Sequence, residues 1–370
     1  MLKELMSDLT VVTVLTLINS FLLVYFIIPK ISWIIESRNL QDKRNGRSSH
    51  TASTPTMAGI AFFLTLIITV FFIQKFDTDA VGLHLIASIT LILMVGVKDD
   101  LVVATPKAKI VVEILAIVFL LFSEELLIDS FHGFLGIYEI PTMLSYAFTI
   151  LMMLTIINAF NLIDGIDGLA SVIAIIIFSV FSLVFYATTY YYYFLICLSF
   201  IGMLLAYLDY NFSNTKKIFM GDTGSLIIGF CIGFCALKYL AMDVSNFSYF
   251  TIQPQNELLV LAAILWIPLF DLLRVIAIRL YHKKSPFYPD RNHSHHILID
   301  GGLSHFEAAM LMGFLNYTLV IIIIWLSAYL NYMELIAVLL TLFTTGVLVL
   351  YVIKKKTLIK NTNFIKWQKN

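Results

Sequence analysis

Four polar side chains, Asn158, Asn161, Asp164 and Asp167, recur at every third position between two apolar runs of the chain. In a helix, residues three positions apart lie on neighbouring parts of one face. The glycine after each aspartate favours a passage from helix into a tight turn, because glycine tolerates positive φ. Ionisable groups are costly where an apolar segment meets water, so these amides and carboxylates indicate a functional site. A polar loop between two helices is the simpler interpretation.

A pair of adjacent carboxylates, Asp99 and Asp100, follows another apolar run, and Lys107 and Lys109 come soon after it. Adjacent carboxylates repel each other unless a cation or a proton lies between them. Mg²⁺ typically binds through one or two carboxylates together with substrate phosphates. The pair alone is a weak signal, because most such pairs are solvated surface, but it fits magnesium chemistry.

Asp222 stands between Gly221 and Gly224, immediately before an apolar segment, and Asn211 precedes it on the same stretch. Glycines allow a ligand to approach the backbone closely, and the start of a helix offers free N–H groups for phosphate. An ordinary helix cap is the alternative interpretation, and a neighbouring Thr or Ser would serve for it.

Three histidines, His293, His295 and His296, lie within four residues of each other in a basic loop that also contains Arg291. The basic residues would attract phosphate or lipid headgroups. A zinc site is an alternative, but no cysteine lies near, and the nearby carboxylates suit magnesium better. Imidazoles that contact a diphosphate are the favoured interpretation.

The composition predicts that these groups belong to an all-α, polytopic membrane protein. Of the 370 residues, 60% are hydrophobic and 13% are charged, and the mean hydropathy is +0.91. Soluble domains average roughly 45–50% apolar residues. The three cysteines all lie in apolar runs and are read as packing residues. The first apolar run, with basic residues after it, is typical of a retained helix and not of a cleaved signal.

A membrane-spanning helix needs about 20 apolar residues, and eleven segments are candidates. Two of them, 109–123 and 143–158, are short. The chain is expected to form a single transmembrane domain over residues 1–353, followed by a basic cytoplasmic tail at 354–370. The eleven predicted spans are 9–29, 56–74, 81–97, 109–123, 143–158, 169–188, 190–208, 224–241, 257–274, 308–329 and 332–353.

The distribution of basic residues predicts an N-terminus outside and all of the polar motifs on the cytoplasmic side. In this orientation 21 of the 24 Lys and Arg residues fall in cytoplasmic loops or the tail, as the positive-inside rule requires. The motifs were not used to assign the orientation, so their convergence on one side supports a single site.

Carboxylates and basic residues beside lipid suit a metal-assisted phosphoryl or phosphosugar transfer. A transporter should carry polar groups near the middle of the bilayer, often in broken helices or internal repeats. The predicted helix interiors are nearly free of charge and no repeat is visible, which disfavours a transporter or lipid flippase.

The motifs together resemble the polyprenyl-phosphate N-acetylhexosamine-1-phosphate transferases, bacterial glycosyltransferase family 4, which also includes the peptidoglycan MraY translocases. Weaker support comes from 55–59, and the resemblance covers the chain up to about residue 353. The motifs that carry it are Asp99-Asp100, the stretch from Asn158 to Gly168, Phe219-Met220-Gly221-Asp222-Thr223-Gly224-Ser225 and His293-Ser294-His295-His296.

The resemblance implies transfer of a sugar 1-phosphate, most simply N-acetylhexosamine 1-phosphate, from a UDP-sugar to undecaprenyl phosphate, which releases UMP. UDP-GlcNAc is the expected donor, and no nucleic acid partner is indicated. The branch of the family that the chain resembles catalyses the first step of O-antigen, teichoic acid or capsule synthesis at the bacterial inner membrane. Some family members are dimers, and the sequence carries no signal for or against a homodimer.

The resemblance also implies roles for individual residues. Asp222 would bind Mg²⁺, with Mn²⁺ as an alternative ion, and Asp99 or Asp100 would activate the lipid phosphate. The implied catalytic residues are Asp99, Asp100, Asp164, Asp167 and Lys109. The implied substrate-binding residues are Asn158, Asn161, Asn211 (towards the nucleotide), Arg291, His293, His295 and His296.

Other activities stay as alternatives. The peptidoglycan branch transfers phospho-MurNAc-pentapeptide and usually shows three consecutive histidines followed by Phe-Glu. Here Ser294 interrupts that run and Ile297-Leu298 follows it, which counts against this substrate. A CDP-alcohol transferase is disfavoured, because its Asp-Gly motif continues with Ala-Arg. The sugar and the pathway are left open by the sequence.

Overall fold

The computed structural model describes residues 8–38, 54–102, 104–246, 252–286, 288 and 290–368, with side chains up to 357. Throughout this part of the chain the secondary structure is helical and contains no strand. The loop 39–53, which supplied basic residues to the orientation argument, lies outside the described residues.

Nine of the described helices are long and apolar enough to cross a membrane, and a bent pair would make ten. The protein is therefore a multi-pass membrane protein, as the composition predicts. The principal helices are α2 (Leu9–Ser37), α3 (Gly59–Ile73), α4 (Val81–Leu101), α5 (Pro106–Leu120), α6 (Thr142–Ile163), α7 (Leu169–Ala187), α8 (Tyr191–Asn211), α9 (Gly221–Leu240), α10 (Glu257–Ile264), α11 (Trp266–Tyr281), the short α12 (Ser294–Asp300), α13 (His305–Ser327) and α14 (Tyr332–Gln368).

Each predicted span has a helical counterpart, but the predicted count of eleven is not reproduced. Helix α5 has only 15 residues and is not among the helices long enough to span. Helix α14 continues beyond the boundary expected at residue 353.

The predicted span 257–274 is wrong as a single helix, because α10 and α11 meet at an angle of 76°. Pro268 explains the break: proline has no N–H, and its ring clashes with the carbonyl four residues earlier, which here belongs to Ile264. The buried side chain of Asn316 on α13 bonds the groups freed at the break. Its Nδ2 donates to the Ile264 carbonyl at 3.3 Å, and its Oδ1 accepts from the Ile267 N–H at 3.2 Å.

Helix α9 forms the centre of the bundle, with its whole spanning segment buried. Two glycines let neighbouring helices approach its first turn. A Cβ at Gly96 of α4 would lie 2.5 Å from the Thr223 Cα, and one at Gly59 of α3 would lie 2.3 Å from the Gly224 nitrogen. Only glycine fits at such distances, so these contacts fix the start of α9 against α3 and α4.

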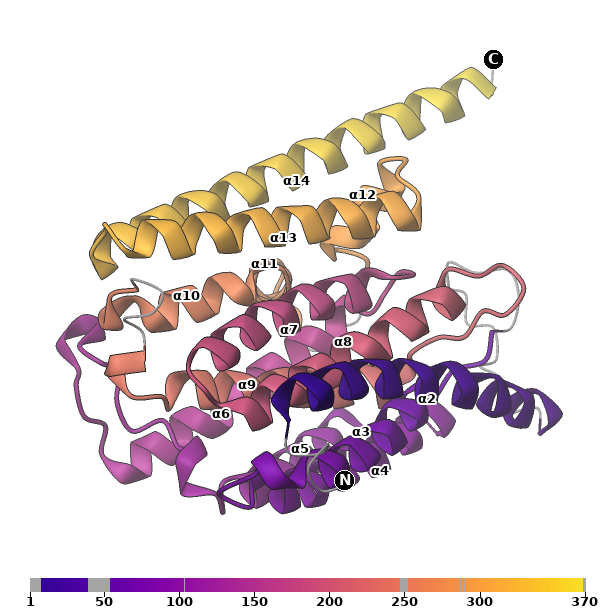
Figure 1. The fold of residues 1–370 in the computed structure, drawn as a ribbon. Coiled ribbons are helices and arrows are strands. Elements are labelled where there is room, and N and C mark those ends of the chain that lie inside the picture. Colours follow the sequence, from indigo (N-terminus) through magenta and orange to yellow (C-terminus); the bar gives the residue numbers. More distant parts are fainter. Residues whose placement is uncertain are drawn as a thin grey trace.

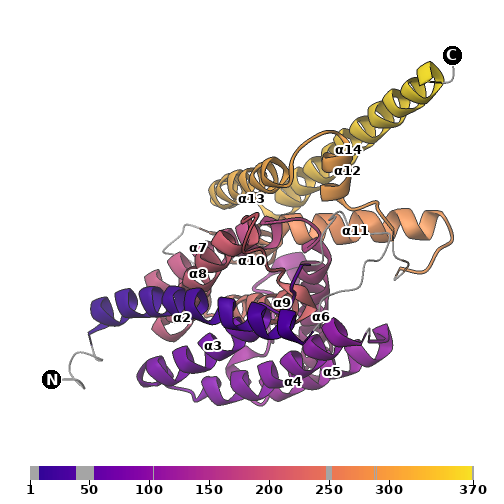
Figure 2. The same cartoon turned by 90° about the vertical axis from the view of Figure 1, so that its right-hand side faces the viewer.

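Helices α13 and α14 lie side by side along one edge of the bundle, over α10 and α11 (Figures 1 and 2). Helix α14 is the outermost element, and only 11% of its spanning segment is buried. In both views its C-terminal end projects beyond the other helices.

Candidate active site

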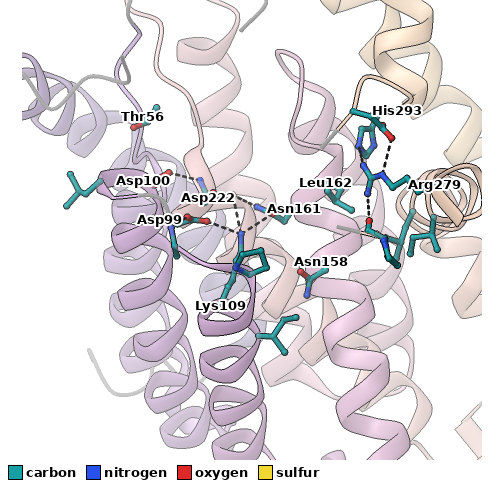
Figure 3. Close-up of a pocket in the computed structure, with 18 residues that line it drawn as sticks. Thr56, Asp99, Asp100, Lys109, Asn158, Asn161, Leu162, Asp222, Arg279 and His293 are labelled. Carbon is teal, nitrogen blue, oxygen red and sulfur yellow. Dashed lines mark hydrogen bonds and ion pairs between the residues drawn. The ribbon is translucent and has the colours of Figure 1, made fainter. Parts of the chain in front are cut away.

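A cavity of about 670 Å³ opens where the ends of several helices meet. Its walls come from the ends of α4 and α6, the later turns of α11 and the first turns of α5 and α9 (Figure 3). Thr56, Pro286, Asp290 and His293 complete the lining. The polar motifs predicted to share one side of the membrane therefore do converge. Of the candidate residues, those that line the cavity are Asp99, Asp100, Lys109, Asn158, Asn161, Asp222 and His293.

Lys109 lies at the centre of the polar cluster on one side of the cavity (Figure 3). Its ammonium nitrogen is 3.3 Å from Asp99 Oδ2, 3.2 Å from Asn161 Oδ1 and 3.5 Å from Asp222 Oδ1. One cation thus bridges carboxylates from α4 and α9, which would otherwise repel each other.

The amide of Asn161 orients Asp222. Its Nδ2 donates to Asp222 Oδ1 at 2.5 Å and to Ser225 Oγ at 2.7 Å, while its Oδ1 accepts from Lys109. The Asp222 side chain nevertheless keeps 37% of its surface exposed, against 11% for Asp99. Asp222 is therefore the carboxylate of this pair with more room for a ligand.

Asp100 holds the first turn of α9 in place. Its carboxylate accepts from the Asp222 N–H at 2.8 Å, the Thr223 N–H at 3.1 Å and the Thr223 hydroxyl at 2.5 Å. The two N–H groups are among those that a helix start leaves without intrahelical partners. The expectation that they would be free to bind phosphate is corrected, because a carboxylate of α4 occupies them.

A buried carboxylate that was not among the predicted site residues holds one of the cavity residues in place. Glu113 of α5 is fully buried and accepts from Asn158 Nδ2 at 2.8 Å. Its sequence signal was a lone acid inside an apolar run, a type of residue that is expensive in a membrane and usually functional.

A second polar group, centred on Arg279, lies on the far side of the cavity (Figure 3). Arg279 Nε donates to Asp290 Oδ2 at 3.1 Å, and its Nη2 is 3.4 Å from His293 Nε2. His293 Nδ1 is in turn 2.6 Å from Asp271 Oδ2. Partial burial disfavours the Asp290 carboxylate, but the bond from Arg279 and those from Asn292 hold the pKa of Asp290 below its usual value.

Sequence reasoning missed Arg279 as a cavity residue. Leu272, Ile276 and Arg279 are spaced i, i+4 and i+7 and so share one face of α11, which lines the cavity. The spacing alone does not show where this face points.

The remaining candidate residues do not line this cavity. The prediction that all of the polar motifs share one site is therefore wrong for these residues. Asp167 forms an ion pair with Lys217 Nζ at 2.7 Å and contacts His305 Nδ1 at 2.9 Å. Asn211 is 4% exposed and acts within the fold. Its Oδ1 accepts from the Gly168 N–H, and its Nδ2 donates to the Tyr207 hydroxyl and the Ile218 carbonyl.

The basic loop likewise contributes fewer residues than predicted. Arg291 is half exposed and pairs with Asp300 at 3.4 Å. His295 is 1% exposed; burial, and then the neighbouring His296 imidazole, lower the pKa of His295 to about 3. Burial and Arg291 also lower the pKa of His296. Burial therefore favours the neutral form of the His295 imidazole.

Asp164 lies just beyond the end of α6, near the cavity but not in its wall. Burial, followed by the negative charges of Asp222, Asp100 and Asp167, raises the pKa of Asp164 to about 7. The ionised form is thus disfavoured in the folded protein. The resulting cost in stability is absent below pH 3.8, grows up to about pH 7 and is complete above it.

We expect Asp164→Asn to raise the melting temperature at pH 8 and to raise it progressively less towards pH 4, because asparagine removes the unfavourable charge. Thermal unfolding of the detergent-solubilised protein across this range measures the difference. Asp209→Asn, at an exposed position of α8, is the matched control and should show no such pH-dependent gain. A gain that is constant with pH would contradict this interpretation.

The donor set suits a magnesium ion shared with a substrate. Within the described residues, no group of three or more His, Cys, Asp or Glu side chains could hold a metal without other ligands. Mg²⁺ commonly uses only one or two carboxylates and completes its octahedron with phosphate oxygens and water. Asp222 and Asp99, which meet at Lys109, fit this requirement.

Residues 82–240 match the family described as glycosyl transferase family 4. The chain is also similar to several bacterial proteins over most of its length. A Bacillus subtilis (strain 168) protein named probable undecaprenyl-phosphate N-acetylglucosaminyl 1-phosphate transferase is 29% identical over 332 residues, which cover 87% of this chain and 89% of the relative.

Two further relatives carry the name undecaprenyl-phosphate alpha-N-acetylglucosaminyl 1-phosphate transferase. The Haemophilus influenzae protein is 28% identical, with 81% of this chain and 82% of the relative covered. The Escherichia coli (strain K12) protein is 26% identical, with 83% and 81% covered. The cavity residues Asp99, Asn161 and Asp222 all lie within the segment that matches the family.

Proposed function

We propose that this chain, whose residues 82–240 match glycosyl transferase family 4, transfers N-acetylglucosamine 1-phosphate from UDP-GlcNAc to undecaprenyl phosphate. An oxygen of the lipid phosphate attacks the sugar-bearing phosphorus of the donor. The bond between the two donor phosphates breaks, and UMP leaves with the bridging oxygen. The products are undecaprenyl-diphospho-GlcNAc and UMP.

The observation that carries this proposal is the cluster of Asp99, Asp222 and Lys109 in a cavity at the helix ends. Phosphoryl transfer requires chiefly that the reacting groups are positioned and that negative charge is neutralised. The cavity offers carboxylates for a divalent ion, an ammonium group between them and a guanidinium group on the far side. Its volume is in the range of small-molecule sites, about 300–1,000 Å³.

Asp222, with Asp99, would hold the Mg²⁺ ion, or Mn²⁺ in its place. The bound ion supplies charge neutralisation at the transferred phosphate. Asn161 keeps the Asp222 carboxylate aimed at the cavity, and Lys109 neutralises negative charge that develops during transfer.

Of the two adjacent aspartates, Asp99 suits contact with the lipid phosphate. Asp100 accepts three bonds from the start of α9, so its role is to position Asp222. Asp99 accepts from the Ala104 N–H and contacts Lys109. A phosphate monoester is mostly ionised at pH 7, and Asp99 therefore orients the nucleophile more than it removes a proton.

Arg279 and His293 take the role that the sequence assigned to Arg291 and the three histidines. Both line the cavity, and the contacts of Arg279 with Asp290 and His293 hold its guanidinium there. A guanidinium group binds phosphate oxygens in a forked geometry. We assign this pair to the phosphates of the sugar nucleotide.

The site would face the cytoplasm, where nucleotide sugars are available, and the protein would reside in the bacterial inner membrane. The positive-inside distribution of Lys and Arg supports this orientation. The reaction would begin the synthesis of a cell-envelope polysaccharide of the O-antigen, teichoic acid or capsule type.

The direct test is UMP release by the purified, full-length protein in detergent with undecaprenyl phosphate, Mg²⁺ and a panel of UDP-sugars. We expect release that requires the lipid, is highest with UDP-GlcNAc and stops when EDTA removes the metal. Mg²⁺ in excess over EDTA should restore it.

Two outcomes would point elsewhere. Preference for UDP-MurNAc-pentapeptide would assign the chain to peptidoglycan synthesis. Lipid or sugar flux through reconstituted vesicles without UMP release would support a transporter instead.

A further inference from the structure

A second hollow of about 450 Å³ lies between α11 and α14, outside the candidate active site. Its floor is apolar and its rim is basic. The residues that line it are Arg274, Ile278, His282, Asn292, Ile297, Val347, Leu350, Tyr351, Lys354 and Lys355. None of them is acidic, and we call this hollow the α11–α14 groove.

The groove and the active cavity lie on different faces of α11. The cavity is lined by Leu272, Ile276 and Arg279, and the groove by Arg274 and Ile278 together with His282, which caps the end of the helix. At 3.6 residues per turn, the centres of these two faces are about 130° apart. A molecule in the groove is therefore separated from Asp222 by the body of α11.

The apolar parts of the two helices end beside each other at the groove. The apolar sequence of α11 ends around Tyr281, and that of α14 ends at Ile353, where three lysines begin. Ile278, Val347 and Leu350 thus lie on the apolar side of the groove, whereas His282, Lys354 and Lys355 lie at its polar end. This is the arrangement that an amphiphile with an acyl chain and an anionic headgroup requires.

Arg274 provides an independent indication of a ligand. Its side chain is 4% exposed and lines the groove, yet its Nε has no hydrogen-bond partner among the described residues. Its Nη2 is occupied by Asp271 Oδ1, the Asn292 carbonyl and Ser294 Oγ. A buried donor without a partner costs about 1–3 kcal/mol, and a small shift of the side chain towards an oxygen of a molecule in the groove would remove this cost.

We propose that the α11–α14 groove binds an anionic phospholipid of the surrounding bilayer, with its acyl chains along the two helices and its phosphate at the lysine end. The charge of the rim selects an anionic headgroup. The occupant is assigned to the bilayer and not to the lipid substrate, because the groove contains none of the carboxylates of the active cavity and faces away from it.

The site is joined to the active cavity by a short chain of contacts. Arg274 binds Asp271, and Asp271 binds His293, which lines the cavity. An occupied groove would therefore steady Arg274 and, through Asp271, the imidazole of His293.

Native mass spectrometry of the purified, full-length protein tests this, with phosphatidylglycerol and phosphatidylcholine of identical acyl chains. We expect one phosphatidylglycerol to be retained, with at least about tenfold preference, because each lysine near the headgroup contributes about fivefold. Lys355→Gln should weaken its binding about fivefold. Lys356→Gln, the next residue along α14, does not line the groove and should change binding less than twofold.

Several results would overturn the proposal. Equal retention of the two lipids, or an equal loss of binding in both lysine variants, would be two of them. Displacement of phosphatidylglycerol by equimolar undecaprenyl phosphate would make the groove a substrate site. Displacement by millimolar inorganic phosphate would make it a site for free phosphate. The measurement involves no turnover, so it stands or falls separately from the proposed transferase activity.

Discussion

Asp222→Asn is expected to lower turnover by about 10³-fold, because a metal that neutralises transferred phosphate contributes several kcal/mol to the barrier. Asparagine keeps the size of the side chain and its contact with Asn161 but removes the charge that would hold the ion. Raising the Mg²⁺ concentration should recover only part of the activity. UMP release measured across a Mg²⁺ titration gives both quantities.

Asp300→Asn is a suitable control for this substitution. Asp300 is half exposed, pairs with Arg291 at the surface and does not line the cavity. It should retain near-normal turnover, and both variants should melt within a few degrees of the wild type. Near-normal turnover in a folded Asp222→Asn variant would contradict the assigned role.

Lys109→Gln is expected to lower kcat by about 10²-fold, the effect of removing one group that stabilises charge in a transition state. The glutamine cannot neutralise the two carboxylates that Lys109 now bridges. Because Lys109 contacts the carboxylate that we propose as the metal ligand, Asp222, the loss of Lys109 should not raise the Mg²⁺ concentration for half-maximal activity. This combination separates a role in the reaction from a role in metal binding.

Lys107→Gln is the matched control for Lys109→Gln. Lys107 stands two residues earlier in the same helix, is exposed and does not line the cavity. It should lose less than a factor of two, an ordinary surface effect. Equal losses of activity in the two lysine variants would mean that the total positive charge of this segment matters, and not the position of Lys109 in the cavity.

The core of the site was predictable because it depends on topology alone. Asp99, Lys109, Asn161 and Asp222 all flank the ends of apolar runs, and the alternation of spans places these ends on one side. The shared position of these four residues can be predicted without knowing how the helices pack or where the side chains point. The four residues therefore meet in the structure although the predicted number of spans is not reproduced.

The rest of the site depends on geometry that spacing does not encode. Asp164 and Asp167 follow the same three-residue period as Asn161, but the chain leaves the helix at Asp164, so the period no longer places their side chains together. Arg279 reaches the cavity only because α11 turns at Leu265. The signal for that turn, Pro268, is visible in the sequence, although the direction of the turn is not.

The burial of α9 has a consequence for how the enzyme would respond to its membrane. Asp222 lies in the first turn of α9, whose spanning segment is buried throughout, while α14 at the periphery is mostly exposed. A change in bilayer thickness acts first on the peripheral helices, which contact lipid and can tilt. The neighbouring helices shield α9 from this change. Acyl-chain length should then alter how readily lipid substrate enters, and leave the rate of the chemical step nearly constant.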